Sequence, residues 1–431
     1  MKKITIISAM LLSATILFGQ YKIDTSFYSA ALDQVKMVDI YFPPGYDENP
    51  SWDFPVIYYL HGWGGNQNAM NTMISFLNQM INDSIIEPVI MVGADNSPAP
   101  LGGSVYVNSV LWGDYEDYNV NDLVQWIDAS FRTIPDKHAR GLLGQSMGGY
   151  GAFRYGILHH DIYNVIASHA GPLNFNDEFY RAQSQQAILS ENNPGPPYFY
   201  NFGGNRPSTI LSFLVCGVCA PDTNTPQTYI NPPIVQYLLD ESGNYIDSVL
   251  AKQEPFDIIF MIDSLSQADS VRILLGDGSN DGFFLYPGTL ALKDTLDLKG
   301  LQYEFFDHTG GHNMPTGFKN RSLIFLDSLL MSPGVITNVN QVQVENTNNT
   351  LHCYPNPCRD ELNIEFVLIQ QDIVRINLYN MMGMKVDQIF YNRQEKGTHK
   401  LDWDTHHLHS GIYLINLRTS RGTKIQKIII Q

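Results

Sequence analysis

Short apolar segments alternate with helical segments between residues 35 and 331, and this alternation restricts the possible fold more than any other feature of the chain. Such a pattern is typical of a mostly parallel sheet with helices on both faces. A helix is predicted over Tyr118–Phe131, where apolar residues recur at helical spacing. We therefore expect a doubly wound α/β domain over residues 21–331, with strands at Lys36–Phe42, Pro55–Leu60, Pro88–Ala94, Gly141–Gly144, Val165–Ser168, Ser270–Leu275 and Tyr303–Asp307.

Three further regions depart from this alternation. Residues 172–235 are rich in Pro, Asn, Gly and aromatic residues and are too long for an ordinary connection, so we expect an insert over the sheet. Residues 332–350 are polar, Asn-rich and without periodicity, which indicates an exposed linker. Short alternating segments separated by turn residues fill residues 351–431 and predict a small all-β sandwich.

The first 20 residues have the order of a secretory signal peptide: Lys2 and Lys3, then an apolar run from Ile4 to Phe18. The mature chain is predicted to begin near Gln20 or Tyr21. The apolar run has about 15 residues whereas a membrane span needs about 20, so secretion fits better than an anchor and no transmembrane segment is expected in the mature chain. A net charge of −17 disfavours nucleic acids and anionic lipid surfaces as partners.

The four cysteines fall into two close pairs along the chain, Cys216 with Cys219 and Cys353 with Cys358. Export to an oxidising compartment favours disulfides, and pairing within each close pair is the simplest expectation. Four cysteines allow three connectivities, and the sequence does not choose among them. A Cys-x-x-Cys redox centre at Cys216 is disfavoured because the segment lacks a strand-to-helix setting.

The segment GQSMG, residues 144–148, places Ser146 directly after an apolar strand and directly before a helix predicted from Met147 to about His159. A serine in a tight strand-to-helix turn projects its hydroxyl above the sheet, and the flanking glycines permit the strained backbone. This context is what a nucleophilic Gly-x-Ser-x-Gly motif requires.

A serine nucleophile needs a general base, because a free hydroxyl is weakly nucleophilic at neutral pH. Two later predicted strands end in turns that carry Asp281 and His312. The order Ser146, Asp281, His312 is that of α/β-hydrolases. In such a triad the imidazole takes the serine proton and the carboxylate orients the imidazole. Asp277 and His308, each four residues earlier, are the neighbouring alternatives.

Residues 35–331 resemble the esterase D family of α/β-hydrolases, which includes feruloyl and acetyl-xylan esterases, S-formylglutathione hydrolases and mycolyltransferases. The match lies in the stretches VIYYLHGWGGN, SVYVNSVLWGDYEDYNVNDLVQWID and ARGLLGQSMGGYGAF and in the acid and histidine turns. The resemblance implies that Ser146 is the nucleophile, Asp281 the acid and His312 the base. It places the oxyanion hole at the backbone N–H groups of Met147 and Trp63.

The same resemblance decides between the neighbouring alternatives. Family members carry the acid three residues after a Gly and the base after paired glycines, which favours Asp281 and His312. We therefore expect Asp277 to cap a turn and His308 to be a strand-end residue. His61, in the oxyanion loop, is expected to be a structural hydrogen-bonding residue.

The mechanism requires no metal and no cofactor, and we predict neither. Residues 277–282 imitate the first half of an EF-hand loop, but Gly288 stands where the bidentate Glu is required. The histidines at 406, 407 and 409 lie in a polar turn and are expected to be solvated.

Aromatic residues of the insert and of a nearby loop have two interpretations of equal weight. They line an acyl or aryl pocket, or they pack the insert onto the domain. The residues concerned are Tyr198, Phe199, Tyr200 and Phe202, with Trp112 and Tyr106.

Residues 351–431 resemble the type A sorting domain of type IX secretion, found in Bacteroidetes. The matching segments are YPNP at 354–357, NMMG at 380–383, SGIY at 410–413 and the ending at 424–430. The resemblance implies passage across the outer membrane by the type IX machinery, often followed by removal of the domain. The alternative, a carbohydrate-binding sandwich, has only Trp403 and Tyr413 as a possible aromatic platform.

Together these patterns predict a secreted serine carboxylic-ester hydrolase that acts through an acyl-enzyme on acyl or feruloyl esters of polysaccharides. An exported enzyme does not meet S-formylglutathione, a cytosolic thioester. Two alternatives remain: acyl transfer or lipid-ester hydrolysis on the same triad, and a catalytically silent protein that binds polysaccharide. The acyl group, the alcohol moiety and the oligomeric state stay open.

Overall fold

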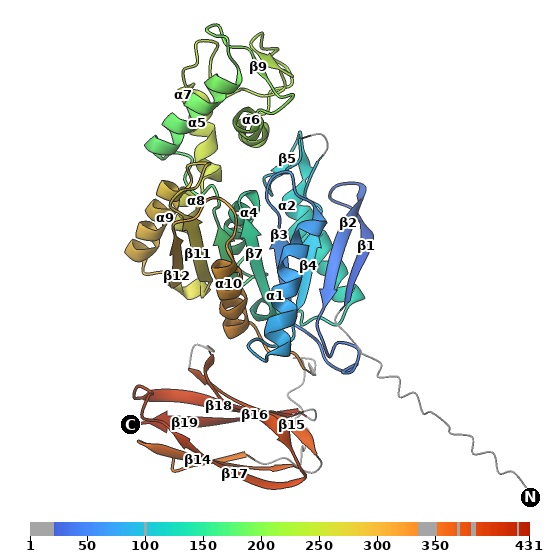
Figure 1. Ribbon diagram of the computed structural model, residues 1–431, viewed down its shortest axis with the longest axis vertical. Coiled ribbons are helices and arrows are strands. Elements are labelled where there is room, and N and C mark those ends of the chain that lie inside the picture. Colours follow the sequence, from blue (N-terminus) through green and yellow to red (C-terminus); the bar gives the residue numbers. More distant parts are fainter. Residues whose placement is uncertain (1–20, 99–100, 335–350, 369–370, 381–384, 420–421) are drawn as a thin grey trace, which may run out of the picture.

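The computed structural model describes residues 21–98, 101–334, 351–368, 371–380, 385–419 and 422–431 (Figure 1). The predicted signal peptide and residues 335–350 of the predicted linker lie outside this part of the chain. Eight strands form a central sheet in the order β1-β2-β4-β3-β7-β8-β11-β12, in which β2 pairs antiparallel with β1 and β4 and the other neighbours are parallel. This confirms the doubly wound, mostly parallel sheet. The strands are β1 (Tyr21–Ser29), β2 (Gln34–Phe42), β3 (Val56–Leu60), β4 (Ile90–Ala94), β7 (Arg140–Gln145), β8 (Val165–His169), β11 (Arg272–Gly278) and β12 (Tyr303–His308).

The seven predicted strands are all present, displaced by at most a few residues at their ends. The sequence pattern missed β1. Among the hydrophobic side chains of this strand, only Phe27 is shown to be deeply buried, so the strand lacks a clear apolar alternation. β1 is an edge strand that pairs along its whole length with β2. Its conformation therefore depends on its partner more than on its own alternation.

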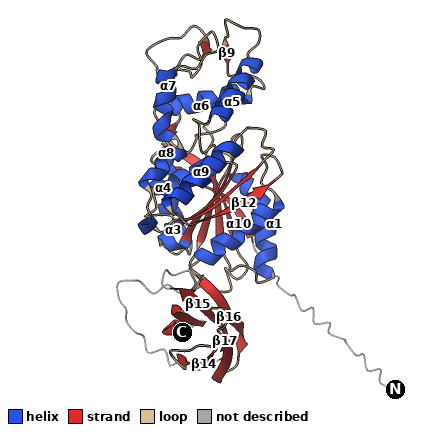
Figure 2. Cartoon of the chain, turned by 90° about the vertical axis from the view of Figure 1, so that its left-hand side faces the viewer, coloured by secondary structure: helices blue, strands red, loops and turns tan. Residues whose placement is uncertain are grey.

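Helices lie on both faces of the central sheet (Figure 2), and a hydrophobic core lies between the helices and each face. In β3, Ile57 and Tyr59 point into one core and Val56, Tyr58 and Leu60 into the other, as the pleat requires. The first core is closed by α1 (Asn71–Asn82) and α10 (Thr316–Leu329). The second is closed by α3 (Val124–Ser130), α4 (Met147–Leu158), α8 (Ile258–Met261) and α9 (Tyr286–Lys299).

The helix predicted over 118–131 is present as three consecutive segments. These are α2 (Tyr115–Asp117), η2 (Tyr118–Leu123) and α3, and η2 is π-helical. A short hairpin of β5 (Asn108–Ser109) and β6 (Gly113–Asp114) precedes them. Single turns of 3₁₀-helix occur at η1 (Gln67–Met70), η3 (Lys137–Ala139), η4 (Glu254–Phe256), η5 (Ile262–Ser264) and η6 (Gln267–Asp269).

A large part of the chain between β8 and β11 forms a separate layer above the carboxyl ends of the parallel strands (Figure 1). It contains α5 (Glu178–Glu191), α6 (Pro207–Cys219) and the short parallel pair β9 (Tyr200–Asn201) and β10 (Ile230–Asn231). The layer continues past residue 235 through α7 (Asp247–Gln253). Its own core includes Val235, Tyr237, Leu239 and Val249, which explains why it extends beyond the predicted insert.

The C-terminal residues form two antiparallel sheets around one core, β13-β14-β17 and β16-β15-β18-β19. Their strands are β13 (Leu351–Tyr354), β14 (Glu361–Leu368), β15 (Asp372–Asn380), β16 (Lys385–Gln394), β17 (Gly397–Asp404), β18 (Gly411–Thr419) and β19 (Gly422–Ile430). Among the helices of the described residues, none is both long and apolar enough to cross a membrane.

All four cysteines are free thiols, so the expectation of two local disulfides is wrong for this structure. Cys216 and Cys219 lie on α6 at a spacing of three residues. Helix neighbours at that spacing keep their Cβ atoms about 5–6 Å apart, whereas a disulfide needs roughly 3.5–4.5 Å. Cys353 and Cys358 are both buried in the C-terminal core.

Candidate active site

Ser146 occupies a sharp turn between β7 and α4, with φ 57° and ψ −124°. Its backbone N–H donates to the carbonyl of His169 at the end of β8 (2.9 Å). Glycines at 144 and 148 allow α4 to approach the sheet this closely. A Cβ on Gly144 would lie 2.0 Å from the Gly148 oxygen, and one on Gly148 would lie 1.9 Å from the Leu60 oxygen. The strained serine at a strand-to-helix junction is the geometry that the motif predicts.

The loop after β3 faces this turn. A Cβ built on Gly62 would lie 3.3 Å from the Cβ of Ser146, which places the following N–H groups beside the serine. The Trp63 indole N–H donates to the Leu101 carbonyl (2.7 Å) and holds the loop. Met147 is the first residue of α4, and the first N–H groups of a helix have no partner inside it. Both predicted oxyanion donors thus belong to the two segments that border Ser146.

His61 has the structural role expected of it. Its Nδ1 lies 2.8 Å from the Gly62 oxygen, and its Nε2 accepts the Asn96 backbone N–H (3.0 Å). The Tyr106 hydroxyl donates to the His61 carbonyl (2.9 Å). Burial lowers the pKa of His61, so the ring is neutral and fully occupied in holding the loop.

Asp281 and His312 form a direct pair. His312 Nδ1 lies 2.7 Å from Asp281 Oδ2, and the other carboxylate oxygen accepts the Phe283 N–H (2.6 Å). The Asp281 side chain is fully buried while that of His312 is 19% exposed. Because an ionised carboxylate only accepts, Nδ1 carries the proton and Nε2 keeps its lone pair free to accept another.

The neighbouring alternatives do not form this pair. Asp277 is buried, and its two oxygens accept the Gly278 N–H (2.7 Å) and the Thr289 hydroxyl (2.9 Å). Burial and the nearby Asp281 carboxyl raise the pKa of Asp277. His308 ends β12, and its ring contacts His169 instead of an acid.

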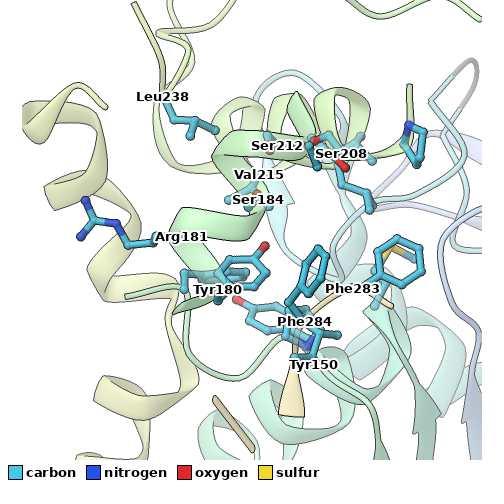
Figure 3. Close-up of a pocket in the computed structure, with 18 of the residues that line it drawn as sticks. Tyr150, Tyr180, Arg181, Ser184, Ser208, Ser212, Val215, Leu238, Phe283 and Phe284 are labelled. Atoms are coloured by element: carbon cyan, nitrogen blue, oxygen red, sulfur yellow. Dashed lines mark hydrogen bonds between the residues drawn. The ribbon is translucent and has the colours of Figure 1, made fainter. Parts of the chain in front are cut away.

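A cavity of about 390 Å³ opens at Ser146 and His312. Its other walls come from α4, from the segment at 282–285 and from the layer above the sheet, where α5 and α6 contribute most residues. Figure 3 shows the rings of Tyr150, Tyr180, Phe283 and Phe284 gathered at one end, with Ser184, Ser208 and Ser212 toward the helices above. The cavity thus has aromatic rings at one end and hydroxyl groups toward the helices above.

The aromatic residues proposed for this pocket do not line it, and their packing interpretation is the one that the structure supports. Phe202 stacks on Phe213 at 3.8 Å between ring centroids, and Tyr200 packs on Tyr237 at 4.7 Å. Phe199 is 54% exposed. The insert does form the roof of the cavity, but through helices α5 and α6, whose cavity-facing residues have no distinctive sequence pattern.

Two contacts around His312 were not foreseen. The Gln145 side chain donates to the His312 carbonyl (3.1 Å), and the Phe283 ring lies 4.5 Å from the imidazole centroid. Gln145 is the variable position of the Gly-x-Ser-x-Gly motif, and Phe283 follows the acid by two residues. The only signal in the sequence was that both residues lie next to predicted site residues. A glutamine or a phenylalanine does not indicate a function by its residue type alone.

Comparison with known proteins agrees with this arrangement. Residues 29–285 match the family model described as "Putative esterase", and residues 352–431 match the secretion system C-terminal sorting domain. Esterase Rv1288 of Mycobacterium tuberculosis is 29% identical over 154 residues, which are 36% of this chain and 33% of that protein. An endo-1,4-beta-xylanase/feruloyl esterase of Xylanibacter ruminicola is 28% identical over 131 residues, 29% of this chain and 18% of that protein. The matches thus span a third or less of these relatives.

A solved ferulic acid esterase matches this structure with a TM-score of 0.51 and 17% identity, over 73% of this chain and 100% of that chain. At this identity the likeness concerns the fold, which is that of the α/β-hydrolases. The family model covers more than half of the residues. The chain therefore belongs to the esterase family of α/β-hydrolases and ends in a type IX secretion sorting domain.

Proposed function

We propose that this protein is a secreted serine carboxylic-ester hydrolase in which Ser146, His312 and Asp281 form the catalytic triad. The observation that carries the proposal is the buried 2.7 Å pair of His312 and Asp281, which borders the same cavity as the strained Ser146. A nucleophile, a base and an orienting acid on three separate loops are what acyl transfer to serine requires.

The reaction begins when the Ser146 hydroxyl attacks the ester carbonyl while Nε2 of His312 takes its proton. The imidazolium then gives this proton to the leaving alcohol, which departs and leaves an acyl-enzyme. Water attacks the acyl carbonyl in the second half, with His312 taking its proton. The bond from Ser146 Oγ to the acyl group then breaks, His312 returns the proton to Oγ, and the carboxylic acid leaves. Asp281 stays ionised and stabilises the imidazolium in both halves.

The negative charge of each tetrahedral intermediate falls on the former carbonyl oxygen. We assign its stabilisation to the backbone N–H groups of Met147 and Trp63. Loss of one such donor typically costs about 2.7–4 kcal/mol of transition-state stabilisation. His61 contributes indirectly, since its two hydrogen bonds fix the loop that carries Trp63.

The cavity favours an aryl acyl group over acetyl. Its volume of about 390 Å³ falls within the roughly 300–1,000 Å³ typical of ligand pockets. Rings gather at one end, where Phe283 lies 4.5 Å from the His312 imidazole, and Ser208 and Ser212 lie toward the helices above. Burial raises the pKa of Tyr180 to about 12, so its phenol stays protonated. We infer feruloyl-type esters of polysaccharides as substrates, in line with the feruloyl esterase of Xylanibacter ruminicola.

The sorting domain indicates export. We infer that the signal peptide takes the chain into the periplasm and that the type IX machinery, through residues 351–431, takes it to the cell surface or the medium. Extracellular polysaccharide esters are available only after this transport.

The test is hydrolysis of methyl ferulate and p-nitrophenyl acetate by the full-length protein and by Ser146→Ala. We expect the parent protein to hydrolyse methyl ferulate and the variant to lose at least about 10³-fold in kcat. A Ser146→Ala protein as active as the parent contradicts the mechanism. Long-chain esters turned over faster than ferulate would instead favour lipid esters as substrates. Binding of polysaccharide without hydrolysis or phosphonate labelling would favour the catalytically silent alternative.

A further inference from the structure

Two histidines outside the proposed triad meet beneath it. His169 ends β8 and His308 ends β12, and their Nε2 atoms lie 3.0 Å apart. The ring planes are nearly parallel, with centroids 5.3 Å apart and an interplanar angle of 15°. His169 is fully buried and His308 is partly buried.

The contact crosses β11, which lies between the two strands. His169 is in register with Gly276, and Gly278 with His308. The absence of side chains at these glycines leaves room above the middle strand. Phe318 of α10 occupies the same face: a Cβ on Gly276 would lie 2.4 Å from its ring, and that ring packs edge-on against His169 at 4.9 Å.

The hydrogen bonds fix the proton positions on both rings. The Gly310 N–H donates to His308 Nδ1 (3.0 Å), so His308 carries its proton on Nε2. This proton is donated to Nε2 of His169, whose own proton is therefore on Nδ1. That Nδ1 is buried and has no hydrogen-bond partner among the described residues. A buried donor without a partner costs free energy, which indicates that the position is kept for the Nε2 bond.

Each histidine also holds a loop that carries a proposed catalytic residue. The His169 carbonyl accepts the Ser146 N–H (2.9 Å). The His308 carbonyl accepts the Ser279 N–H (2.8 Å) in the acid loop. Through Nδ1, His308 holds Gly310 in the loop of His312. The side-chain bond between the two histidines thus joins the serine turn to the other two loops.

We propose that His169 and His308 are a pair of positioning residues. Their hydrogen bond sets the distance between the serine turn and the loops of Asp281 and His312. Neither histidine is among the residues that line the cavity at Ser146. The pair acts by holding three loops in one arrangement, and its role rests on the proposed serine-hydrolase function. Misplacement of reacting groups by about 1 Å can cost on the order of 10²-fold in rate.

His169 suits the acceptor role because it stays uncharged. Burial and the neighbouring His308 lower the pKa of His169 to about 3, so protonation does not break the bond near neutral pH. The groups that act electrostatically on His169 are His308, His312 and Asp281.

Four variants of the full-length protein separate hydrogen bonding from shape. His169→Leu removes the acceptor, whereas His169→Gln supplies an amide oxygen at a similar reach. His308→Asn keeps an acceptor for Gly310 but loses the donor toward His169. The fourth is the double variant His169→Leu/His308→Asn. The matched control is His138→Leu, at a histidine whose side chain is 53% exposed.

We expect His169→Leu and His308→Asn to lower kcat for p-nitrophenyl acetate by about 10- to 100-fold with KM within about twofold. His169→Gln should recover kcat to within about threefold of the parent. The double variant should be no slower than the slower single variant, because both remove one bond. Labelling of Ser146 by a fluorophosphonate should slow in parallel, while the control matches the parent.

Parent-like kcat in a folded His308→Asn protein would overturn the proposal, as would additive losses in the double variant. So would His169→Gln as slow as His169→Leu, since shape alone would then explain the loss. If His169→Leu does not fold, the kcat of His308→Asn relative to the parent tests the proposal. A parent protein that hydrolyses no ester would refute the proposed function itself. An active parent whose variants are equally active would refute only the positioning role of the two histidines.

Discussion

At the scale of single residues, the carboxyl groups near the site differ in environment. Asp281 has both oxygens bonded to N–H donors, from His312 and Phe283. Asp277 is buried beside it, and burial together with the Asp281 charge raises the pKa of Asp277. The raised pKa keeps Asp277 protonated near neutral pH, so it adds no negative charge beside Asp281.

Ionisation of Asp277 should limit activity at alkaline pH. As pH rises through its raised pKa, a second negative charge appears beside Asp281 and disturbs the His312 pair. We expect Asp277→Asn to keep kcat within about fivefold of the parent near neutrality and to extend activity to higher pH, because the amide keeps an oxygen that accepts a hydrogen bond and does not ionise. The check is the pH profile of kcat with p-nitrophenyl acetate. Identical alkaline limbs in parent and variant would contradict it.

Asp257 gives a prediction about stability. It is fully buried, its Oδ2 accepts the Phe175 N–H (2.8 Å), and burial raises its pKa to about 7. Because the folded pKa exceeds the unfolded one, the folded state binds the proton more tightly, and stability falls as pH rises from about 4 to about 7.

Asp257→Asn should remove this pH dependence. We expect the variant to be more stable than the parent at pH 8 by roughly 1–4 kcal/mol and to differ little at pH 4. Melting temperatures at the two pH values test this, with Asp294→Asn, a side chain 74% exposed, as the matched control. An equal shift at both pH values would argue against titration of Asp257.

At the scale of elements, α5 and α6 decide what enters the cavity. They belong to the layer between β8 and β11, and the sheet beneath them supplies the proposed chemistry. The roof of the cavity and the proposed catalytic residues thus come from different parts of the chain, so the cavity can be narrowed from above without a change near Ser146.

Ser184→Trp on α5 should fill the cavity. We expect kcat/KM for methyl ferulate to fall by about 10- to 200-fold, mainly through KM, while p-nitrophenyl acetate changes by less than about threefold. The matched control is Gln186→Trp, at an exposed position on the same helix. Equal losses for both esters would indicate that the cavity does not hold the acyl group.

At the scale of the whole molecule, the esterase region and the C-terminal sheets have separate cores. One contact between them is the ion pair of Arg375 on β15 with Glu87, just before β4 (2.8 Å). This contact lies at the end of the sheet opposite the cavity, because β4 runs parallel to β7 and Ser146 follows the carboxyl end of β7.

A chain that ends at residue 334 should therefore keep its esterase activity. We expect kcat/KM for p-nitrophenyl acetate within about twofold of the full-length protein, since each region buries its own core. Glu87→Gln in the full-length protein controls for loss of the ion pair alone. A folded truncated protein with a tenfold lower rate would show that the C-terminal sheets support the site.

The sequence by itself determined the features that depend on local pattern. The seven predicted strands follow from runs of apolar residues, and the Ser146 turn follows from glycines that no other residue can replace at such close approach. Strand pattern placed acids and histidines at the carboxyl ends of two later strands, which meet at one edge of the sheet. The choice of Asp281 and His312 over Asp277 and His308 came from the family resemblance, and the two side chains do form a pair.

Only the tertiary structure decided the features that depend on distant contacts. β1 is a strand because β2 offers it an edge, and the cavity walls on α5 and α6 acquire their role from packing over the sheet. The His169–His308 bond joins residues far apart in sequence across the glycines of β11, and neither histidine has a local motif. Side-chain contacts of this kind arise from the three-dimensional arrangement of strands and leave no periodicity in the chain itself.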